Sequence, residues 1–134
     1  MNNLSAQTPY GILGKEGIKA LANAFYDVME ERIEATPIRA MHAENMTEIK
    51  QKLYEYLTGW MGGPPLYSDR YGSVCLTSAH KPYAIGTQER DQWLDCMDIA
   101  LDRIAVQYTS DSKQLKTMLK QPLFSIADAV RNQD

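Results

Sequence analysis

The chain has 134 residues, 44% of them hydrophobic, which is enough for one domain with a substantial core. Its 14 basic and 17 acidic residues are interspersed and give a formal net charge of −3, which argues against a nucleic-acid partner because phosphate binding needs a concentrated basic face. The sequence shows no secretory signal and no apolar run approaching the roughly 18 residues of a membrane span, so we expect a cytoplasmic protein without a membrane partner.

The first third of the chain is predicted to contain one long helix and one short helix. We expect residues 1–10, which are mostly polar, to form a loose N-terminal segment. From residue 15 to about residue 34, apolar residues recur every three or four positions, which predicts a helix with one buried stripe. The stripe consists of Ile18, Leu21, Ala22, Phe25, Met29 and Ile33. Thr36 and Pro37 then predict the start of a short helix that ends near Met41, because proline fits the first helical position.

A second long helix is predicted over residues 47–61, and a glycine pair followed by two prolines ends it. Its apolar face consists of Ile49, Leu53, Tyr56, Leu57 and Trp60. Residues 64–87 are interrupted by proline and glycine and have only weak periodicity. We interpret them as a loop with a short helical turn over residues 75–80.

A third long helix is predicted from Thr87, which can cap it, to about Tyr108. Its stripe consists of Trp93, Met97, Ala100, Leu101, Ile104 and Tyr108. Asp111 to Gln114 has the pattern of a capping box and predicts the start of a last helix, which Pro122 is expected to kink or split in two. No segment alternates at period two, so the chain is predicted to be all-α.

One ordered block of residues, from Gly62 to Met97, is the most informative part of the sequence. It contains a Gly-Gly-Pro-Pro stretch, then His80, and then Trp93 thirteen residues later on a long amphipathic helix. Together with Tyr26 on the first helix, this order resembles the truncated haemoglobins of group II. The resemblance covers most of the chain.

The resemblance implies an all-α, two-over-two helical sandwich globin, with a single truncated globin domain over residues 1–134. It also implies a haem b cofactor, which would be held non-covalently because the chain lacks the Cys-x-x-Cys-His motif of covalent attachment. In this family one histidine binds the haem iron as its metal ligand, and His80 matches that position. We expect its second ring nitrogen to donate to a backbone carbonyl or to water. Without the resemblance, a lone histidine near a proline is more often a surface loop residue.

On the other side of the iron, Tyr26 and Trp93 match the family's distal tyrosine and tryptophan. Each offers one hydrogen-bond donor on an otherwise apolar side chain, which suits a bound ligand with partial negative charge. From helical spacing alone, both are more readily explained as core aromatics. His42 stands where most members carry phenylalanine or tyrosine. Its imidazole can donate to the ligand or order a water, or it can simply face solvent.

The remaining pocket residues are also carried over from the resemblance. Ile49, Leu53 and Met97 are expected to be walls of the distal side, so no distal histidine stands at residue 49. Lys52 and Tyr67 are expected to reach the haem propionates.

Three positions depart from the family pattern. Ala79 replaces the arginine that usually precedes the histidine, and Gly14-Lys15 replaces a Gly-Gly pair. Tyr83, which we count among the haem-binding residues, replaces the phenylalanine usual after Pro82. These differences weaken the expected propionate anchoring and leave the haem prediction in place.

The favoured function is reversible binding of O2, and also of NO and CO, at a five-coordinate ferrous haem, in a monomer or weak dimer. A donor-rich distal pocket retains oxygen strongly, which suits oxygen chemistry or the detoxification of NO or peroxide better than oxygen delivery. The alternative is an enzyme, a haem peroxidase or NO dioxygenase, that uses an external reductase because no flavin domain is attached. A third class, a haem-free helical interaction module, requires the whole block to be a coincidence.

Other types of chemistry find little support in the sequence. Cys75 and Cys96 do not form a disulfide framework and are expected to be reduced thiols. Two histidines and two cysteines are too few for a convincing structural zinc site. Three aspartates with helical spacing, Asp95, Asp98 and Asp102, are interpreted as a solvated face. The sequence has neither a glycine-rich phosphate loop nor a nucleophile elbow.

Overall fold

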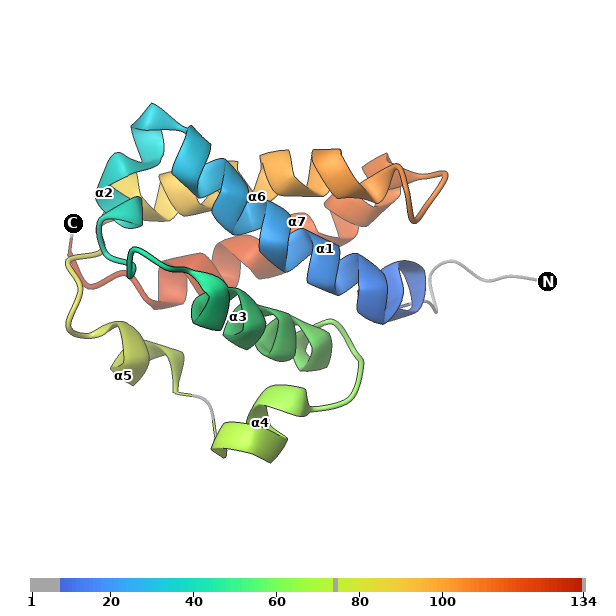
Figure 1. Ribbon diagram of the computed structural model, residues 1–134, viewed down its shortest axis with the longest axis horizontal. Helices are drawn as coiled ribbons and strands as arrows, with labels where there is room; N and C mark the ends of the chain where they lie inside the picture. The colour runs from blue at the N-terminus through green and yellow to red at the C-terminus, as the bar shows by residue number, and fades with distance from the viewer. Residues whose placement is uncertain (1–7, 74, 134) are drawn as a thin grey trace.

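The computed structural model describes residues 8–73 and 75–133 (Figure 1). Within these ranges every regular element is a helix, so the all-α prediction is confirmed. The elements are α1 (Pro9–Glu31), the 3-10 helix η2 (Ile33–Ala35), α2 (Thr36–Arg39), α3 (Thr47–Trp60), α4 (Leu66–Tyr71), α5 (Leu76–His80), α6 (Thr87–Ala105) and α7 (Ser112–Ala129).

The four long helices form a two-over-two sandwich. Helix α1 packs against both α3 and α6, and α6 packs against α7, while the short helices α4 and α5 lie at the edge next to α3 (Figure 1). The apolar stripes of the long helices meet in one core, whose most deeply buried large side chains include Ile18, Leu21, Phe25, Met29, Leu57, Met97, Leu115 and Leu119. The predicted sandwich is therefore confirmed.

Helix α1 begins earlier than expected. The Thr8 hydroxyl accepts a hydrogen bond from the Gly11 backbone N–H at 3.0 Å, and Pro9 takes the first helical position. Residues 8–10 are therefore not a loose segment, and residues 1–7 lie outside the described residues. Gly14 interrupts the helix with a φ of +69°, a conformation that glycine adopts at low cost. This interruption explains why apolar periodicity becomes visible only beyond it.

The segment between α3 and α6 contains one more helix than expected. Helix α5 confirms the predicted turn, whereas the six-residue helix α4 was not predicted; neither of these short helices buries any of its residues. At the start of α6, the Gly86 N–H donates to Glu89 Oε1 at 2.7 Å, so the N-cap is Gly86 and not Thr87. Both cysteines are free, Cys75 exposed and Cys96 buried.

Pro122 lies inside α7 and does not split it. The helix runs from Ser112 to Ala129, and the Asp111 carboxylate caps it by accepting from the Gln114 N–H at 3.0 Å, as its sequence pattern predicts. Burial of the apolar stripe of α7 against the core offsets the backbone hydrogen bond that the proline lacks. No helix among the described residues is both long and apolar enough to cross a membrane.

Two isoleucines that differ in burial provide a test of the core. Ile18 is 0% exposed and Ile33 is 83% exposed. We expect Ile18→Ala to lower the free energy of unfolding by about 2–5 kcal/mol, because it removes buried methyl groups and leaves a cavity. The control Ile33→Ala is expected to change it by no more than about 0.5 kcal/mol. Denaturant titration of both variants checks this, and equal losses would contradict the assigned core.

Candidate functional site

His80 is the last residue of α5, and its ring is held in a defined tautomer. Its Nδ1 lies 2.7 Å from the carbonyl oxygen of Leu76. A carbonyl oxygen only accepts, so Nδ1 carries the proton and donates. The predicted hydrogen bond to a backbone carbonyl is therefore confirmed. In the neutral ring Nε2 then keeps a free lone pair, which is the form in which an imidazole binds a metal.

Tyr26, on α1, belongs to a cluster of aromatic rings. Its ring centroid lies 4.9 Å from that of Phe25 and 5.4 Å from that of His42, both in edge-to-face geometry. The ring of Trp93, on α6, lies 5.2 Å from Phe25. Phe25 is completely buried and joins the two predicted distal residues, a linking role that the apolar stripe alone did not reveal.

The Tyr26 hydroxyl and the Trp93 indole N–H are both hydrogen-bond donors. Neither donor forms a hydrogen bond with another described residue, and neither atom is completely shielded from solvent. Burial raises the pKa of Tyr26 well above its usual range, so the phenol keeps its proton. The two side chains therefore offer two neutral donors from different helices.

His42 lies in the turn between α2 and α3, and Arg39 holds that turn in place. The Arg39 guanidinium donates to the carbonyl oxygens of Ala43 and Glu44, each at 3.0 Å, and also pairs with Glu30 at 3.1 Å. These contacts stabilise the path of the chain where it carries His42 past Tyr26.

The hydrogen bonding of His42 determines what its ring can do. Its Nδ1 donates to the Ile38 carbonyl oxygen at 2.8 Å. Burial lowers the pKa of His42; the hydrogen bond to Ile38 opposes this effect, and the positive charge of Arg39 adds to it. The ring is therefore neutral near pH 7, and its Nε2 is a hydrogen-bond acceptor and not a donor.

The pKa of His42 gives a testable pH dependence of stability. In the unfolded chain an ordinary histidine takes up a proton near pH 6.5, whereas folded His42 takes it up only at lower pH. Between these two values the unfolded state binds more protons, so stability falls as the pH decreases through this window. We expect the free energy of unfolding of the haem-free protein to fall more between pH 7.5 and 5.5 in the wild type than in His42→Phe. Parallel denaturant titrations measure this, and identical pH profiles would contradict it.

Ile49 and Leu53, one turn apart on α3, are partly buried and pack against the core. Met97, on α6, is completely buried. The three side chains thus contribute apolar surface from α3 and α6.

Lys52 and Tyr67 meet in a second cluster, at the junction of α3 and α4. The Lys52 ammonium lies 3.9 Å from Glu48 Oε1 and 5.4 Å from the ring centroid of Tyr71. The Tyr67 ring lies 4.7 Å from that of Tyr71 and 6.2 Å from that of Tyr56. These contacts place both residues on α3 and α4, and no recorded ring pair or ion pair among the described residues links them to the cluster around Tyr26.

Tyr83 lies in the loop between α5 and α6, where its side chain is 41% exposed. Its carbonyl oxygen accepts a hydrogen bond from the Asn132 carboxamide at 2.7 Å. No sequence motif points to Asn132. It lies 49 positions from Tyr83, and only the tertiary fold brings the two residues together.

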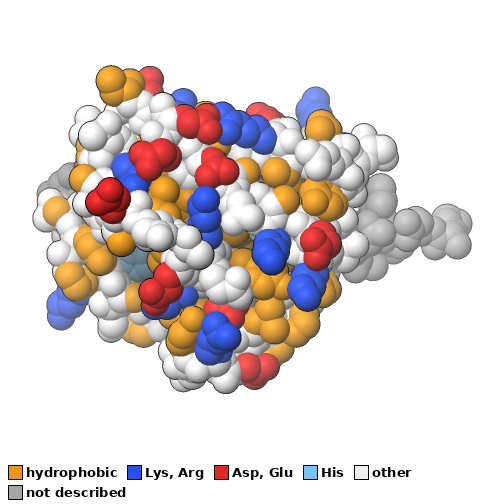
Figure 2. All heavy atoms as spheres, in the orientation of Figure 1, with side chains coloured by type: hydrophobic (Ala, Val, Ile, Leu, Met, Phe, Trp, Pro, Cys, Tyr) orange, Lys and Arg blue, Asp and Glu red, His pale blue; other side chains and the backbone are white. Residues whose placement is uncertain are grey.

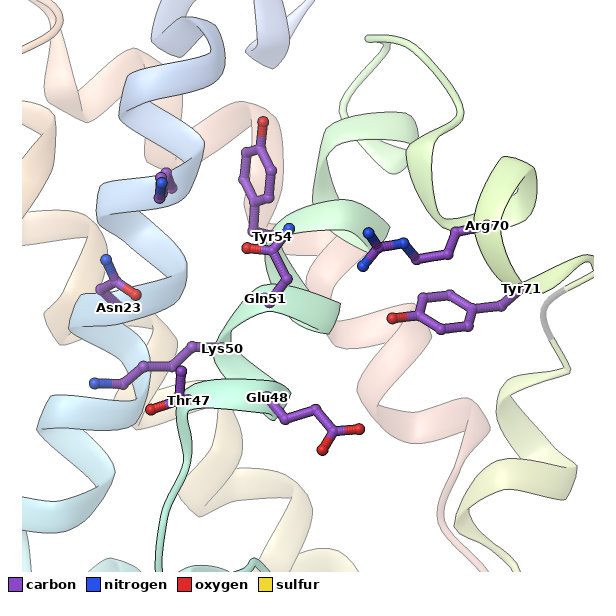
Figure 3. Close-up of a pocket in the computed structure, with 9 residues that line it drawn as sticks. Asn23, Thr47, Glu48, Lys50, Gln51, Tyr54, Arg70 and Tyr71 are labelled. Atoms are coloured by element: carbon purple, nitrogen blue, oxygen red, sulfur yellow. The ribbon is translucent and has the colours of Figure 1, made fainter.

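A separate polar groove of about 510 Å³ lies between α1, α3 and α4 (Figure 3). Lys50 and Arg70 line it, and both are already paired, Lys50 with Asp27 at 3.0 Å and Arg70 with Glu55 at 3.3 Å. None of the residues predicted to bind haem lines this groove. On the face shown in Figure 2, apolar side chains lie between the charged ones, and histidine atoms are recessed among them.

The donor set fits a haem better than a bare metal ion. The described residues contain no group of three or more histidine, cysteine, aspartate or glutamate side chains able to hold a metal ion. His80 provides a single free nitrogen, which suits an iron that a porphyrin already holds through its other ligands.

Comparison with known proteins gives consistent results. Residues 8–126 match the family described as "Bacterial-like globin". The "Group 2 truncated hemoglobin YjbI" of Bacillus subtilis (strain 168) is 33% identical over 104 residues, which are 77% of this chain and 76% of that protein.

Two solved structures are similar over nearly the whole chain. The cold-adapted truncated hemoglobin of Pseudoalteromonas haloplanktis TAC125 is 38% identical with a TM-score of 0.87, over 96% of this chain and 100% of that one. The Group II 2-on-2 hemoglobin of Agrobacterium tumefaciens is 32% identical with a TM-score of 0.85, over 100% of both chains.

Proposed function

The chain belongs to the bacterial-like globins and, within them, to the group II truncated haemoglobins, and we propose that it binds haem b non-covalently through His80 and reversibly binds dioxygen. Haem and small gaseous ligands follow from membership of the family. We further propose that His80 is the iron ligand, that the haem is haem b, and that the ligands are O2, NO and CO.

One observation carries the proposal. His80 donates through Nδ1 to the Leu76 carbonyl oxygen at 2.7 Å, which leaves Nε2 as a free electron-pair donor. The hydrogen bond also restricts rotation of the ring and increases the basicity of Nε2. When bound, the haem supplies the iron at which a diatomic gas can bind.

The neutral donors on the opposite side favour dioxygen over carbon monoxide. A hydrogen bond strengthens as the acceptor gains negative charge. Dioxygen bound in haem proteins carries more negative charge than bound carbon monoxide does. Tyr26 keeps its proton because burial raises its pKa, and Trp93 offers an N–H that does not titrate. In this proposal Ile49, Leu53 and Met97, which are buried or partly buried, form the apolar walls of the distal side.

The same donors support a second candidate function, an NO dioxygenase or haem peroxidase that uses an external reductase. Two donors that retain dioxygen slow its release, which suits the consumption of NO or peroxide better than the delivery of oxygen. The formation of nitrate from NO by the oxygen-loaded protein distinguishes this function from simple reversible binding.

Absorption spectroscopy of the purified chain titrated with haem tests the proposal directly. We expect a saturable Soret band at one haem per chain, and reversible spectral changes when the reduced protein meets dioxygen or carbon monoxide. Extraction of the pigment into acidified organic solvent checks that the haem is not covalently attached. Absence of a saturable Soret band would overturn the proposal.

A further inference from the structure

The segment that follows α7 is bonded to the loop that follows His80. The backbone N–H groups of Asn132 and Gln133 both donate to the carbonyl oxygen of Ile85, at 2.8 and 3.0 Å. The N–H of Ile85 in turn donates to the side-chain oxygen of Asn132 at 3.0 Å. A short ladder of hydrogen bonds thus joins two segments that are 47 residues apart in sequence.

The carboxamide of Asn132 both donates and accepts hydrogen bonds with this loop. Its Nδ2 donates to the Tyr83 carbonyl oxygen at 2.7 Å and lies 3.5 Å from the carbonyl oxygen of His80 itself. Its Oδ1 accepts from Ile85, so the orientation of the amide is determined by its partners, since an N–H must face an oxygen acceptor. One side chain therefore bridges residues 80, 83 and 85.

Ion pairs hold the end of α7 where it can present Asn132. Asp128 Oδ1 accepts from Arg90 Nη1 at 2.8 Å and from Arg131 Nε at 3.0 Å. Arg90 lies in the first turns of α6, and it also pairs with Asp91 at 3.0 Å. The end of α7, just before Asn132, is thereby attached to the beginning of α6, just after the loop that Asn132 contacts.

Few other contacts restrain the loop and the histidine before it. Helix α5 buries none of its residues, and residues 81–84 are exposed. Such a segment, with little apolar packing, opens at low free-energy cost unless hydrogen bonds to a stable element restrain it. Among the described residues, Asn132 makes the only side-chain hydrogen bonds from another helix or segment to residues 80–85.

We propose that Asn132 is a positioning residue for His80, which it holds by fixing the backbone at residues 80, 83 and 85. This inference rests on the proposed function, in which His80 binds the haem iron. A ligand to iron acts well only when its nitrogen is held at a fixed distance and tilt, and here the segment after α7 supplies that restraint.

Two variants of Asn132 and one control test the proposal. Asn132→Ala removes the side-chain hydrogen bonds and keeps the backbone ladder to Ile85. Asn132→Asp has the same shape but places a carboxylate oxygen against the Tyr83 carbonyl. Gln133→Ala is the matched control, because Gln133 contributes only its backbone to the loop and to Arg131.

Three measurements on the full chain, two of them with haem bound and one without it, separate positioning from simple anchoring. They are the rate of haem loss to excess apomyoglobin, the iron–histidine stretching band of the reduced protein by resonance Raman, and the melting temperature of the haem-free protein by circular dichroism. We expect both Asn132 variants to lose haem on the order of tenfold faster, because Asn132→Ala removes all the side-chain hydrogen bonds and Asn132→Asp removes those that Nδ2 donates to residues 80 and 83. We also expect their stretching band to shift and broaden, while Gln133→Ala matches the wild type.

Each alternative result has a distinct meaning. If the wild type shows no saturable Soret band, the proposed function fails, and this inference fails with it. If the wild type binds haem and the Asn132 variants keep its haem-loss rate and stretching band, the positioning role alone is wrong. A lower melting temperature with an unchanged stretching band would make Asn132 an anchor for the segment after α7 and would also overturn the proposal. If Asn132→Asp does not fold, Asn132→Ala alone decides between these results.

Discussion

Replacing His80 with glycine is expected to abolish the five-coordinate spectrum of the reduced protein and to weaken haem binding by orders of magnitude. His42 is the only other histidine, and its Nδ1 is already bonded to Ile38. It cannot take over the role of His80, because it lies in the α2–α3 turn beside Tyr26, in the group of residues assigned to the distal side. Haem titration and resonance Raman spectroscopy of the reduced variant measure the effect.

Added imidazole provides a sharp control for this experiment. If His80 supplies only a nitrogen to the iron, millimolar imidazole is expected to restore haem binding and the iron–imidazole band to His80→Gly. His42→Phe serves as the matched histidine control and is expected to keep the wild-type iron–histidine band. A His80→Gly protein whose band matches the wild type without added imidazole would show that another residue binds the iron.

Replacing Trp93 with phenylalanine is expected to speed the release of dioxygen by about tenfold or more. The change keeps most of the ring volume next to Phe25 but removes the indole N–H. A hydrogen bond to a partly charged acceptor is worth roughly 1.5–3 kcal/mol, and 1.4 kcal/mol corresponds to a factor of ten. Stopped-flow measurement of the oxygen off-rate checks this value.

The second tryptophan of the chain provides the control for Trp93. Trp60 lies on α3, is partly buried against the core, and is not part of the aromatic cluster around Tyr26. Trp60→Phe therefore makes the same chemical change away from the proposed site and is expected to leave the off-rate within a factor of about two. Carbon monoxide release should respond less to Trp93→Phe than oxygen release does. Equal off-rates in the two variants would remove Trp93 from the distal role.

The polar groove between α1, α3 and α4 shows why pocket size is a poor guide to function in this protein. Two of its three cationic side chains, Lys50 and Arg70, are paired with carboxylates of this chain, Asp27 and Glu55. The assigned site instead combines one free imidazole nitrogen with two unpaired donors. The chemistry of these atoms, and not the volume of a hollow, supports a haem.

The sequence by itself was enough to predict the helical class and the four long helices. Each long helix carries an apolar stripe with a period of three to four residues, and this pattern is a local property of the chain. The order of His80 and Trp93 behind the Gly-Gly-Pro-Pro stretch was also sufficient to identify the family, which the match of residues 8–126 confirms. Capping was predictable where one side chain decides it, as at Asp111.

Local patterns were less informative where structure depends on few buried residues or on backbone conformation. The pattern of apolar residues predicts neither α4, which has six residues and buries none of them, nor the start of α1, where Gly14 interrupts the periodicity. The hydroxyl of Thr87 can accept a hydrogen bond and therefore predicts an N-cap at that residue. In the structure the Glu89 carboxylate accepts from the Gly86 N–H, which moves the N-cap of α6 by one residue.

Only the tertiary structure decided how the site residues are held. Periodicity says which face of a helix is buried, but it cannot say which distant atoms a polar side chain meets. The hydrogen bond from Asn132 to Tyr83 depends on this folded arrangement, and so does the edge-to-face contact between the rings of Tyr26 and His42. A hydrogen bond depends on distances of a few tenths of an ångström between groups far apart in sequence, and those distances exist only once the four long helices have packed.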